Sequence, residues 1–313
     1  MKRDIAFESK GTTVRGWLTT PDAGSGPYPV VVMAGGWCYV KEIVMPHYAE
    51  FFLKQGIATL LFDYRNFGAS DGTPRQHLDP WMQIEDYRNA ISFATKQPDL
   101  DPARVGIWGI SYSGGHALVL AAIDPRIQCV VSNIAVVDGF QNMRRVHGER
   151  LFPRLLEAIQ DDRELRYATG KGGYIPMSSE DPEHELSTWP FPDVYQIFNE
   201  IKQREAPAHE HRSTLESVEL LMQYSVYPYA RRILRTPVMM VVAENDDKTL
   251  WDLEIDVYNQ IPAANKKLVL LPTVTHMSLY NKQSHLQVAA TAAAQFLHEH
   301  LVAASQGVAV GVS

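Results

Sequence analysis

Three side chains, widely separated along the chain, have the types needed to turn a hydroxyl group into a nucleophile. The first is Ser111, in the segment Gly-Ile-Ser-Tyr-Ser-Gly-Gly (109–115), which follows an apolar run and precedes a small, apolar segment with helical spacing. A serine at a sharp turn between a strand and a helix projects its hydroxyl above the sheet edge, where helix amides also point. Such a hydroxyl attacks a carbonyl carbon once an imidazole removes its proton and a carboxylate orients that imidazole. The segment therefore predicts Ser111 as a nucleophile.

The segment departs from the usual G-x-S-x-G spacing at its fifth position. Ser113 stands there, and glycine follows only at Gly114. Ser113 is therefore an alternative nucleophile, and a plain Gly/Ser-rich connection between strand and helix is a further interpretation. We favour Ser111, because the strand is expected to end at Trp108 and the turn must then begin at once with Gly109.

The orienting acid and the base are expected after two later strands, in the order serine, acid, histidine. Asp246 follows an apolar, strand-like run (238–243), and His276 follows the last predicted strand. Asp247 is an alternative acid, and either aspartate could instead cap the next helix. Because catalytic groups of open α/β sheets gather beyond the carboxyl ends of the strands, Ser111, Asp246 and His276 are expected to converge.

Backbone amides near the serine are expected to receive the negative charge that develops on the substrate oxygen. One is the amide of Tyr112, directly after the nucleophile, and the other is the amide of Trp37, after a glycine pair that ends at Gly36. The glycine pair also fits an ordinary tight turn. Gly36, Tyr39 and Met277 are predicted to contact the substrate, although aromatic and methionine side chains also pack in cores.

Other residues with chemical potential are interpreted as structural. His209-Glu210-His211 has the spacing of a metal-ligand fragment, but the further ligands that a metal site needs are absent from the sequence nearby. We expect a solvated loop there. His116 is expected to pack on the helix after the nucleophile, and Cys38 to fill space beside the glycine loop. The sequence thus predicts no metal site and no organic cofactor.

The elements that must position these residues follow an α/β pattern. A hairpin (4–20) is expected at a sheet edge, and apolar strands then alternate with helices, which indicates a mostly parallel, eight-stranded sheet flanked by helices. The expected strands are 30–34, 58–62, 104–108, 127–132, 238–243 and 267–271, and the expected helices are 46–55, 81–96, 116–122, 250–260 and 283–300.

The alternation stops between residues 139 and 235. Three helical pieces are expected there, separated by loops rich in Gly, Pro and Ser, over 152–166, 192–204 and 214–223. A connection of this length indicates an inserted helical cap over one end of the sheet. The expected domains are a core (1–138 and 236–303), the cap (139–235) and a flexible tail (304–313).

Composition limits the kinds of partner. The chain has 313 residues, with 29 basic and 36 acidic side chains and a net charge of −7, which argues against a nucleic-acid partner. Two cysteines are too few for a disulfide framework, and neither a secretory signal nor an apolar run of membrane-spanning length is present. We expect a cytoplasmic protein without a membrane partner. A homodimer is compatible with the sequence.

Several stretches resemble one enzyme superfamily along nearly the whole chain. These are 31–42, 62–72, 107–116, 241–246 and 274–276. The chain resembles α/β-hydrolases, and within them the branch of dienelactone-hydrolase-like and Xaa-Pro-peptidase-like esterases and fungal polyketide transferases. It departs from that branch at Gly35-Gly36, where His-Gly is common.

The resemblance implies Ser111 as nucleophile, Asp246 as acid, His276 as base, and the amides of Trp37 and Tyr112 as oxyanion donors. The expected function is a serine hydrolase that cleaves a small carboxylic ester or thioester through an acyl-serine intermediate. Two alternatives remain at this point: an acyltransferase of the polyketide-transferase type that uses the same triad, and a non-catalytic ligand receptor on a hydrolase scaffold.

Overall fold

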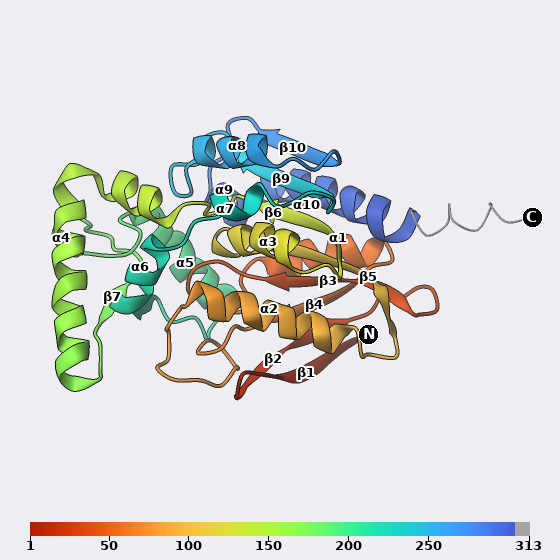
Figure 1. Cartoon of the computed structure of the whole chain (residues 1–313), viewed down its shortest axis with the longest axis horizontal. Helices are drawn as coiled ribbons and strands as arrows, with labels where there is room; N and C mark the ends of the chain where they lie inside the picture. Colours follow the sequence, from red (N-terminus) through yellow and green to blue (C-terminus); the bar gives the residue numbers. More distant parts are fainter. Residues whose placement is uncertain (304–313) are drawn as a thin grey trace, which may run out of the picture.

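An eight-stranded sheet forms the centre of the computed structural model, which describes residues 1–303 (Figure 1). Its strand order is β1-β2-β4-β3-β5-β6-β9-β10; the first two strand pairs, β1 with β2 and β2 with β4, are antiparallel, and the others are parallel. The strands are β1 (Lys2–Ser9), β2 (Thr12–Thr19), β3 (Tyr28–Ala34), β4 (Ala58–Phe62), β5 (Leu100–Ile110), β6 (Ile127–Asn133), β9 (Val238–Ala243) and β10 (Lys266–Leu271). The prediction of a mostly parallel, eight-stranded α/β sheet is confirmed.

Helices cover both faces of this sheet. Helices α1 and α10 contact one another and the central strands on one face, whereas α2, α3 and α8 pack on the other face. Strands β4 and β9 are buried along their whole length, as expected for apolar strands that are covered on both sides. The core helices are α1 (Met45–Lys54), α2 (Pro80–Ala94), α3 (Tyr112–Ile123), α8 (Trp251–Gln260), α9 (Ser278–Asn281) and α10 (Gln283–His298), which continues as a π-helical turn (Glu299–Ala303).

Strand β5 begins earlier than its apolar run suggests. Tyr28 of β3 is paired with Leu100, and the register then shifts before Val30 pairs with Val105. The polar and proline-containing start of β5 carries no strand-like alternation, so the expected strand covered only 104–108. The carboxyl end, which leads to Ser111, lies where the sequence places it.

The inserted segment (residues 139–235) lies between β6 and β9 and adds no strand to the large sheet. In Figure 1 its long helix α4 stands at the end of the molecule opposite the last turn of α10. This helix is longer than the expected 152–166, and its backbone leaves helical geometry at Gly148. The segment contains α4 (Gly139–Thr169), β7 (Tyr174–Pro176), α5 (Pro192–Arg204), β8 (Arg212–Thr214), α6 (Leu215–Met222) and α7 (Tyr227–Ala230).

The segment is not purely helical, because β7 and β8 form a small antiparallel pair. Three-residue strands are too short for a period-two pattern to reveal them. The expected tail (304–313) lies outside the described residues.

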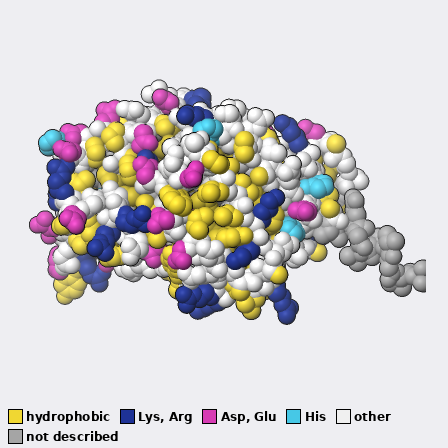
Figure 2. Space-filling view, turned by 90° about the horizontal axis from the view of Figure 1, so that it is seen from above, with side chains coloured by type: hydrophobic (Ala, Val, Ile, Leu, Met, Phe, Trp, Pro, Cys, Tyr) yellow, Lys and Arg dark blue, Asp and Glu magenta, His cyan; other side chains and the backbone are white. Residues whose placement is uncertain are grey.

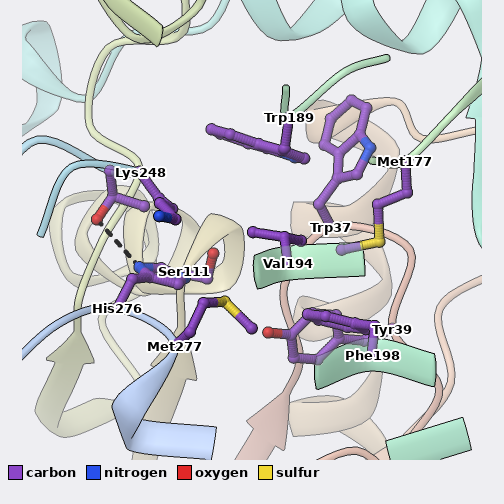
Figure 3. Close-up of a pocket in the computed structure, with 11 residues that line it drawn as sticks. Trp37, Tyr39, Ser111, Met177, Trp189, Val194, Phe198, Lys248, His276 and Met277 are labelled. Atoms are coloured by element: carbon purple, nitrogen blue, oxygen red, sulfur yellow. Dashed lines mark hydrogen bonds between the residues drawn. The ribbon is translucent and has the colours of Figure 1, made fainter. Parts of the chain in front are cut away.

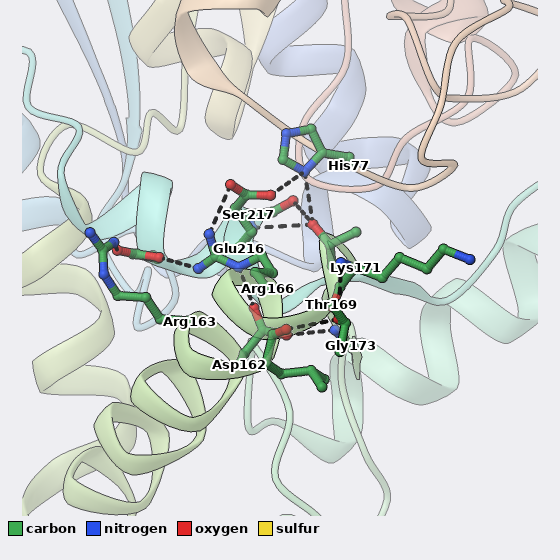
Figure 4. A network of polar contacts seen from close by, with 12 residues as sticks. His77, Asp162, Arg163, Arg166, Thr169, Lys171, Gly173, Glu216 and Ser217 are labelled. Carbon is green, nitrogen blue, oxygen red and sulfur yellow. Dashed lines mark hydrogen bonds and ion pairs between the residues drawn. The ribbon is translucent and has the colours of Figure 1, made fainter.

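A polar network fastens α4 to the rest of the inserted segment and to the core (Figure 4). The Arg166 guanidinium binds Asp162 within α4 at 2.8 Å and both Glu216 and Glu219 of α6, at 3.0 and 2.5 Å. Next to it, His77 of the core contacts the Thr214 hydroxyl at 3.0 Å. These contacts set the position of α6 against the loop before α2.

On the face seen in Figure 2, acidic and basic side chains are interspersed around a central hydrophobic stretch. Neither sign of charge forms a continuous patch on this face. Among residues 1–303, no helix has both the length and the apolar character needed to cross a membrane.

Candidate active site

Ser111 lies at a strained turn between β5 and α3. Its φ is 57° and its ψ is −119°, a combination that non-glycine residues rarely adopt. The flanking glycines are required by close packing: a Cβ atom on Gly109 would lie 2.1 Å from the Ser113 carbonyl oxygen, and one on Gly115 would lie 2.2 Å from that of Val136. The sequence therefore builds a sharp elbow between strand and helix at this point.

Ser113, the alternative nucleophile, occupies a different environment. Its side chain is fully buried, donates a hydrogen bond to the Gly35 carbonyl oxygen and accepts one from the Tyr64 hydroxyl at 2.7 Å. Ser111, in contrast, lines a cavity. The serine at the fifth position of the motif thus joins the elbow to the glycine loop after β3.

Asp246 and His276 meet beside this elbow. The Asp246 Oδ2 atom lies 2.8 Å from His276 Nδ1, and Oδ1 accepts hydrogen bonds from the backbone N–H groups of Lys248 and Thr249, both at 2.9 Å. Burial acts to raise the pKa of Asp246, but His276 and those N–H groups outweigh it and hold that pKa below its ordinary value. Asp247 points elsewhere: it is exposed and pairs with the Lys248 ammonium.

The contact with Asp246 fixes the orientation of the His276 ring. Because Nδ1 carries the hydrogen that Asp246 accepts, Nε2 carries the lone pair that could take a proton. His276 and Ser111 line the same cavity (Figure 3). The Tyr280 hydroxyl lies 3.4 Å from Nε2, and the two rings stack at an interplanar angle of 25°. Sequence analysis missed Tyr280, because it is part of a short helix with no motif.

The glycine loop after β3 comes directly against the elbow. A Cβ atom on Gly36 would lie 2.8 Å from the Ser111 Cβ, so only glycine allows this approach. Within residues 1–303, the backbone N–H groups of Trp37 and Tyr112 donate no hydrogen bond to a protein acceptor. The two predicted donors therefore remain available on either side of Ser111.

The cavity at Ser111 lies between the core and the inserted segment. Tyr39 and Met277 line it, whereas Gly36 backs Ser111 without lining it. The inserted segment supplies a wall that the sequence did not reveal, because its residues come from irregular loops and from α5. The lining consists of Trp37, Tyr39, Ser111, Met177, Trp189, Val194, Phe198, Lys248, Thr249, His276 and Met277.

Lys248 brings a charge to the edge of this cavity, but the charge is already paired. Its ammonium lies 2.8 Å from Asp247 and 3.1 Å from Asp193 of α5, and it stands 4.0 Å above the centre of the Phe191 ring. The lysine thereby links the loop after β9 to the inserted segment.

The expectation of a solvated loop at His209 and His211 is wrong. His209 is buried, its Nδ1 lies 3.0 Å from the Cys38 carbonyl oxygen, and its Nε2 lies 3.2 Å from His211 Nδ1. His211 Nε2 in turn lies 2.6 Å from the Ser178 hydroxyl. Since a carbonyl oxygen only accepts, His209 donates from Nδ1, His211 donates to His209, and Ser178 donates to His211. Burial lowers the pKa of His209 to about 3 and that of His211 to about 4.

The other two side chains interpreted as structural are packed as expected. His116 is fully buried, with Tyr224 and Gln83 as hydrogen-bond partners at 3.1 and 3.0 Å, and burial raises the pKa of the Cys38 thiol. In the part of the chain that the structure describes, no group of three or more His, Cys, Asp or Glu side chains is arranged to hold a metal ion.

Known proteins resemble the chain over most of its length. It is 40% identical over 243 residues to the quorum-quenching protein AidA of Acinetobacter baumannii, which covers 78% of each chain. It is 31% identical to the thiohydrolase aneE of Aspergillus aculeatus, over 82% of this chain and 80% of that protein. It is 29% identical to the polyketide transferase af380 of Aspergillus fumigatus, over 96% of this chain and 99% of that protein.

A solved structure and a family model agree with the fold. The α/β-hydrolase GrgF from Penicillium sp. sh18 superposes with a TM-score of 0.79 at 22% identity, over 96% of this chain and 99% of that chain. The model of the family described as X-Pro dipeptidyl-peptidase (S15 family) matches residues 10–278, which include the elbow, Asp246 and His276. The chain therefore belongs to this family, within the α/β-hydrolase superfamily.

Proposed function

We propose that the protein is a serine hydrolase that cleaves a carboxylic ester or thioester through an acyl intermediate on Ser111. The observation that carries the proposal is the hydrogen-bonded Asp246–His276 pair, whose histidine lines the same cavity as the strained serine. An imidazole that a buried carboxylate orients can take the proton from a serine hydroxyl and so make it a nucleophile.

In the proposed mechanism, His276 Nε2 takes the Ser111 proton as the oxygen attacks the substrate carbonyl carbon. The N–H groups of Trp37 and Tyr112 receive the negative charge on the carbonyl oxygen, and His276 then gives the proton to the leaving alcohol or thiol. Water, activated by the same imidazole, releases the acyl group from Ser111. These steps require no metal and no organic cofactor.

The lining of the cavity supports an uncharged, apolar acyl group. Aromatic and methionine side chains form most of its wall, and the nearby Lys248 charge is offset by Asp193 and Asp247. The inserted segment forms one side of the cavity, and we propose that it acts as a cap that limits the access of water. The thiohydrolase among the relatives supports a thioester as one substrate class.

The test is covalent labelling with a fluorophosphonate, followed by intact-mass measurement and hydrolysis assays on a panel of esters and thioesters. Wild type is expected to gain one adduct, and Ser111→Ala none, with loss of nearly all turnover because triad members act as a unit. Ser113→Ala is the matched control from the same segment, and it should still be labelled. Labelling of Ser111→Ala, or no labelling of wild type, would overturn the proposal and favour a ligand receptor.

Acyl transfer to an alcohol or amine is the second candidate. The full-length similarity to a polyketide transferase and the apolar lining of the cavity favour it. Product analysis with and without an added acceptor separates the two: hydrolysis gives only the free acid, whereas transfer gives the acceptor ester or amide at the expense of the acid.

A further inference from the structure

Glu254 is a fully buried acid beside the Asp246–His276 pair. It belongs to α8, with its Oε2 atom 2.7 Å from the backbone nitrogen of Ala135 and its Oε1 atom 3.3 Å from the Thr249 hydroxyl oxygen. None of these contacts is part of the proposed mechanism. The sequence gives it no prominence, because an acid in the first turn of a helix is ordinary.

The partners of Glu254 differ from those of the other buried acids. Each of the others faces a cationic or imidazole group, in the pairs Asp63–Lys41, Asp86–Arg65, Asp124–Arg126, Asp162–Arg166 and Asp246–His276. Within residues 1–303, Glu254 has no such partner. An ionised carboxylate without a cationic or imidazole partner is costly to bury, so the uncharged form of Glu254 is favoured. Burial first, and then the charge of Asp246, raise the pKa of Glu254 well above its usual range.

A count of protons at Thr249 leads to the same conclusion independently. The Thr249 hydroxyl oxygen lies 2.9 Å from Asp246 Oδ2 and 3.3 Å from Glu254 Oε1, yet the hydroxyl has one proton. Asp246 is nearer and carries the charge that His276 requires, so the hydroxyl donates to Asp246. An ionised Glu254 would then place two lone pairs against each other, whereas a protonated one donates to Thr249.

We propose that Glu254 is an uncharged carboxylic acid that donates a hydrogen bond to Thr249 and so directs the Thr249 hydroxyl proton onto Asp246. The inference rests on the proposed function, in which Asp246 orients His276. Glu254 is thus a positioning residue. Because the Thr249 oxygen accepts the proton of Glu254, its own hydroxyl proton points to Asp246. The Asp246 Oδ2 atom then accepts hydrogen bonds from both Thr249 and His276. The uncharged form of Glu254 also confines the negative charge of this buried region to the carboxylate next to the imidazole.

The first test reads the protonation state directly and needs no activity. Infrared difference spectra between wild type and Glu254→Gln at neutral pH are expected to show the carbonyl stretch of a protonated carboxylic acid in wild type only. The same band should persist in Ser111→Ala, so the result is independent of whether Ser111 is the nucleophile. A spectrum with only ionised carboxylate at this position would overturn the proposal.

The second test separates positioning from packing. Glutamine keeps both contacts, since its amide nitrogen donates to Thr249 and its oxygen accepts from Ala135, so Glu254→Gln should keep kcat within about threefold. Glu254→Leu, similar in size, removes the donor that orients the Thr249 hydroxyl, and Thr249→Val removes the hydroxyl that donates to Asp246, so each should lower kcat about tenfold with little change in KM.

The double variant Thr249→Val/Glu254→Leu completes a cycle and should be no slower than Thr249→Val alone. Full additivity, or an equal loss in Glu254→Gln and Glu254→Leu at equal thermal stability, would contradict the positioning role. If Ser111→Ala kept its turnover, the proposed function would fail while the infrared result still decided the protonation of Glu254.

Discussion

His209 donates a hydrogen bond from Nδ1 to the backbone carbonyl oxygen of Cys38, across 3.0 Å. Cys38 directly follows Trp37, and its φ of 61° is unusual for a side-chain-bearing residue. The inserted segment therefore holds in place a strained peptide of the loop that carries a proposed oxyanion donor.

Removal of this hydrogen bond should weaken oxyanion stabilisation. In His209→Ala the Cys38 peptide loses its donor, and kcat is expected to fall about tenfold or more with a smaller change in KM, because oxyanion contacts act in the transition state. Asparagine places an amide nitrogen close to the position of Nδ1, so His209→Asn should recover most of the loss. Steady-state kinetics and the affinity for a boronic acid inhibitor measure the effect. An equal loss in both variants would argue for packing alone.

The approach of Gly36 to Ser111 makes a sharp steric prediction. Gly36→Ala would place a Cβ atom 2.8 Å from the Ser111 Cβ, so the loop or the elbow must move. Turnover is expected to fall by about a hundredfold, since small misplacements near reacting atoms have large effects. Gly173→Ala is the matched control, because its new Cβ atom meets nothing nearer than 3.4 Å. Near-normal turnover in Gly36→Ala would remove this loop from the proposed site.

The buried histidines predict how stability depends on pH. Burial lowers the pKa of His116 to about 3 from 6.5, and His209 and His211 are lowered to about 3 and about 4. In the unfolded chain these imidazoles take up protons as the pH falls through 6.5, whereas the folded chain does not until about pH 4. The contribution of the uncharged, buried histidines to the free energy of unfolding is thus fully present above pH 6.5 and is lost as the pH falls below that value.

Urea unfolding at a series of pH values between neutral and about pH 4.5 measures this loss. The free energy of unfolding should fall towards acid by up to about 1.4 kcal/mol per pH unit for each buried histidine. His116→Asn should reduce the slope by about one such increment. A change at the exposed His184 should leave the slope as it is, and an unchanged slope in His116→Asn would mean that His116 is not held uncharged.

The two carboxylates at Lys248 are expected to differ in their effects. Asp193 joins Lys248 to α5 of the inserted segment, whereas Asp247 is next to the lysine in the chain. Asp193→Asn should speed amide hydrogen exchange at the start of α5 and raise KM about two- to threefold, a small effect because the Asp193 partner is exposed to water, which screens the ion pair. Asp247→Asn serves as the control with the same charge change. Equal exchange in the two variants would show that Lys248 does not fasten the segment.

The sequence predicted the parts of the fold and site that depend on regular elements. Ser111, Asp246 and His276 could be proposed as site residues because each follows the carboxyl end of an apolar strand, and the strand order brings those ends together. Their geometry agrees with this expectation: Asp246 and His276 share a hydrogen bond, and His276 and Ser111 share a cavity.

Residues contributed by irregular segments could not be predicted in this way. Met177 and Trp189 reach the cavity from loops whose path depends on contacts with the core, and no local period marks them. His209 is polar and lies near prolines, which suggests exposure, yet its burial follows from a carbonyl acceptor that is far away in the chain. Glu254 likewise acquires its environment only when α8 packs beside Asp246.

The serine at the fifth position of the elbow motif changes how the candidate site is held together. Through Ser113, the peptide of Gly35 and the ring of Tyr64 are tied to the same turn that presents Ser111. Hydrogen bonds of one side chain thus join the ends of three separate strands, and they couple the position of the Ser111 turn to that of the glycine loop. A glycine at this position would have no side chain to make either hydrogen bond.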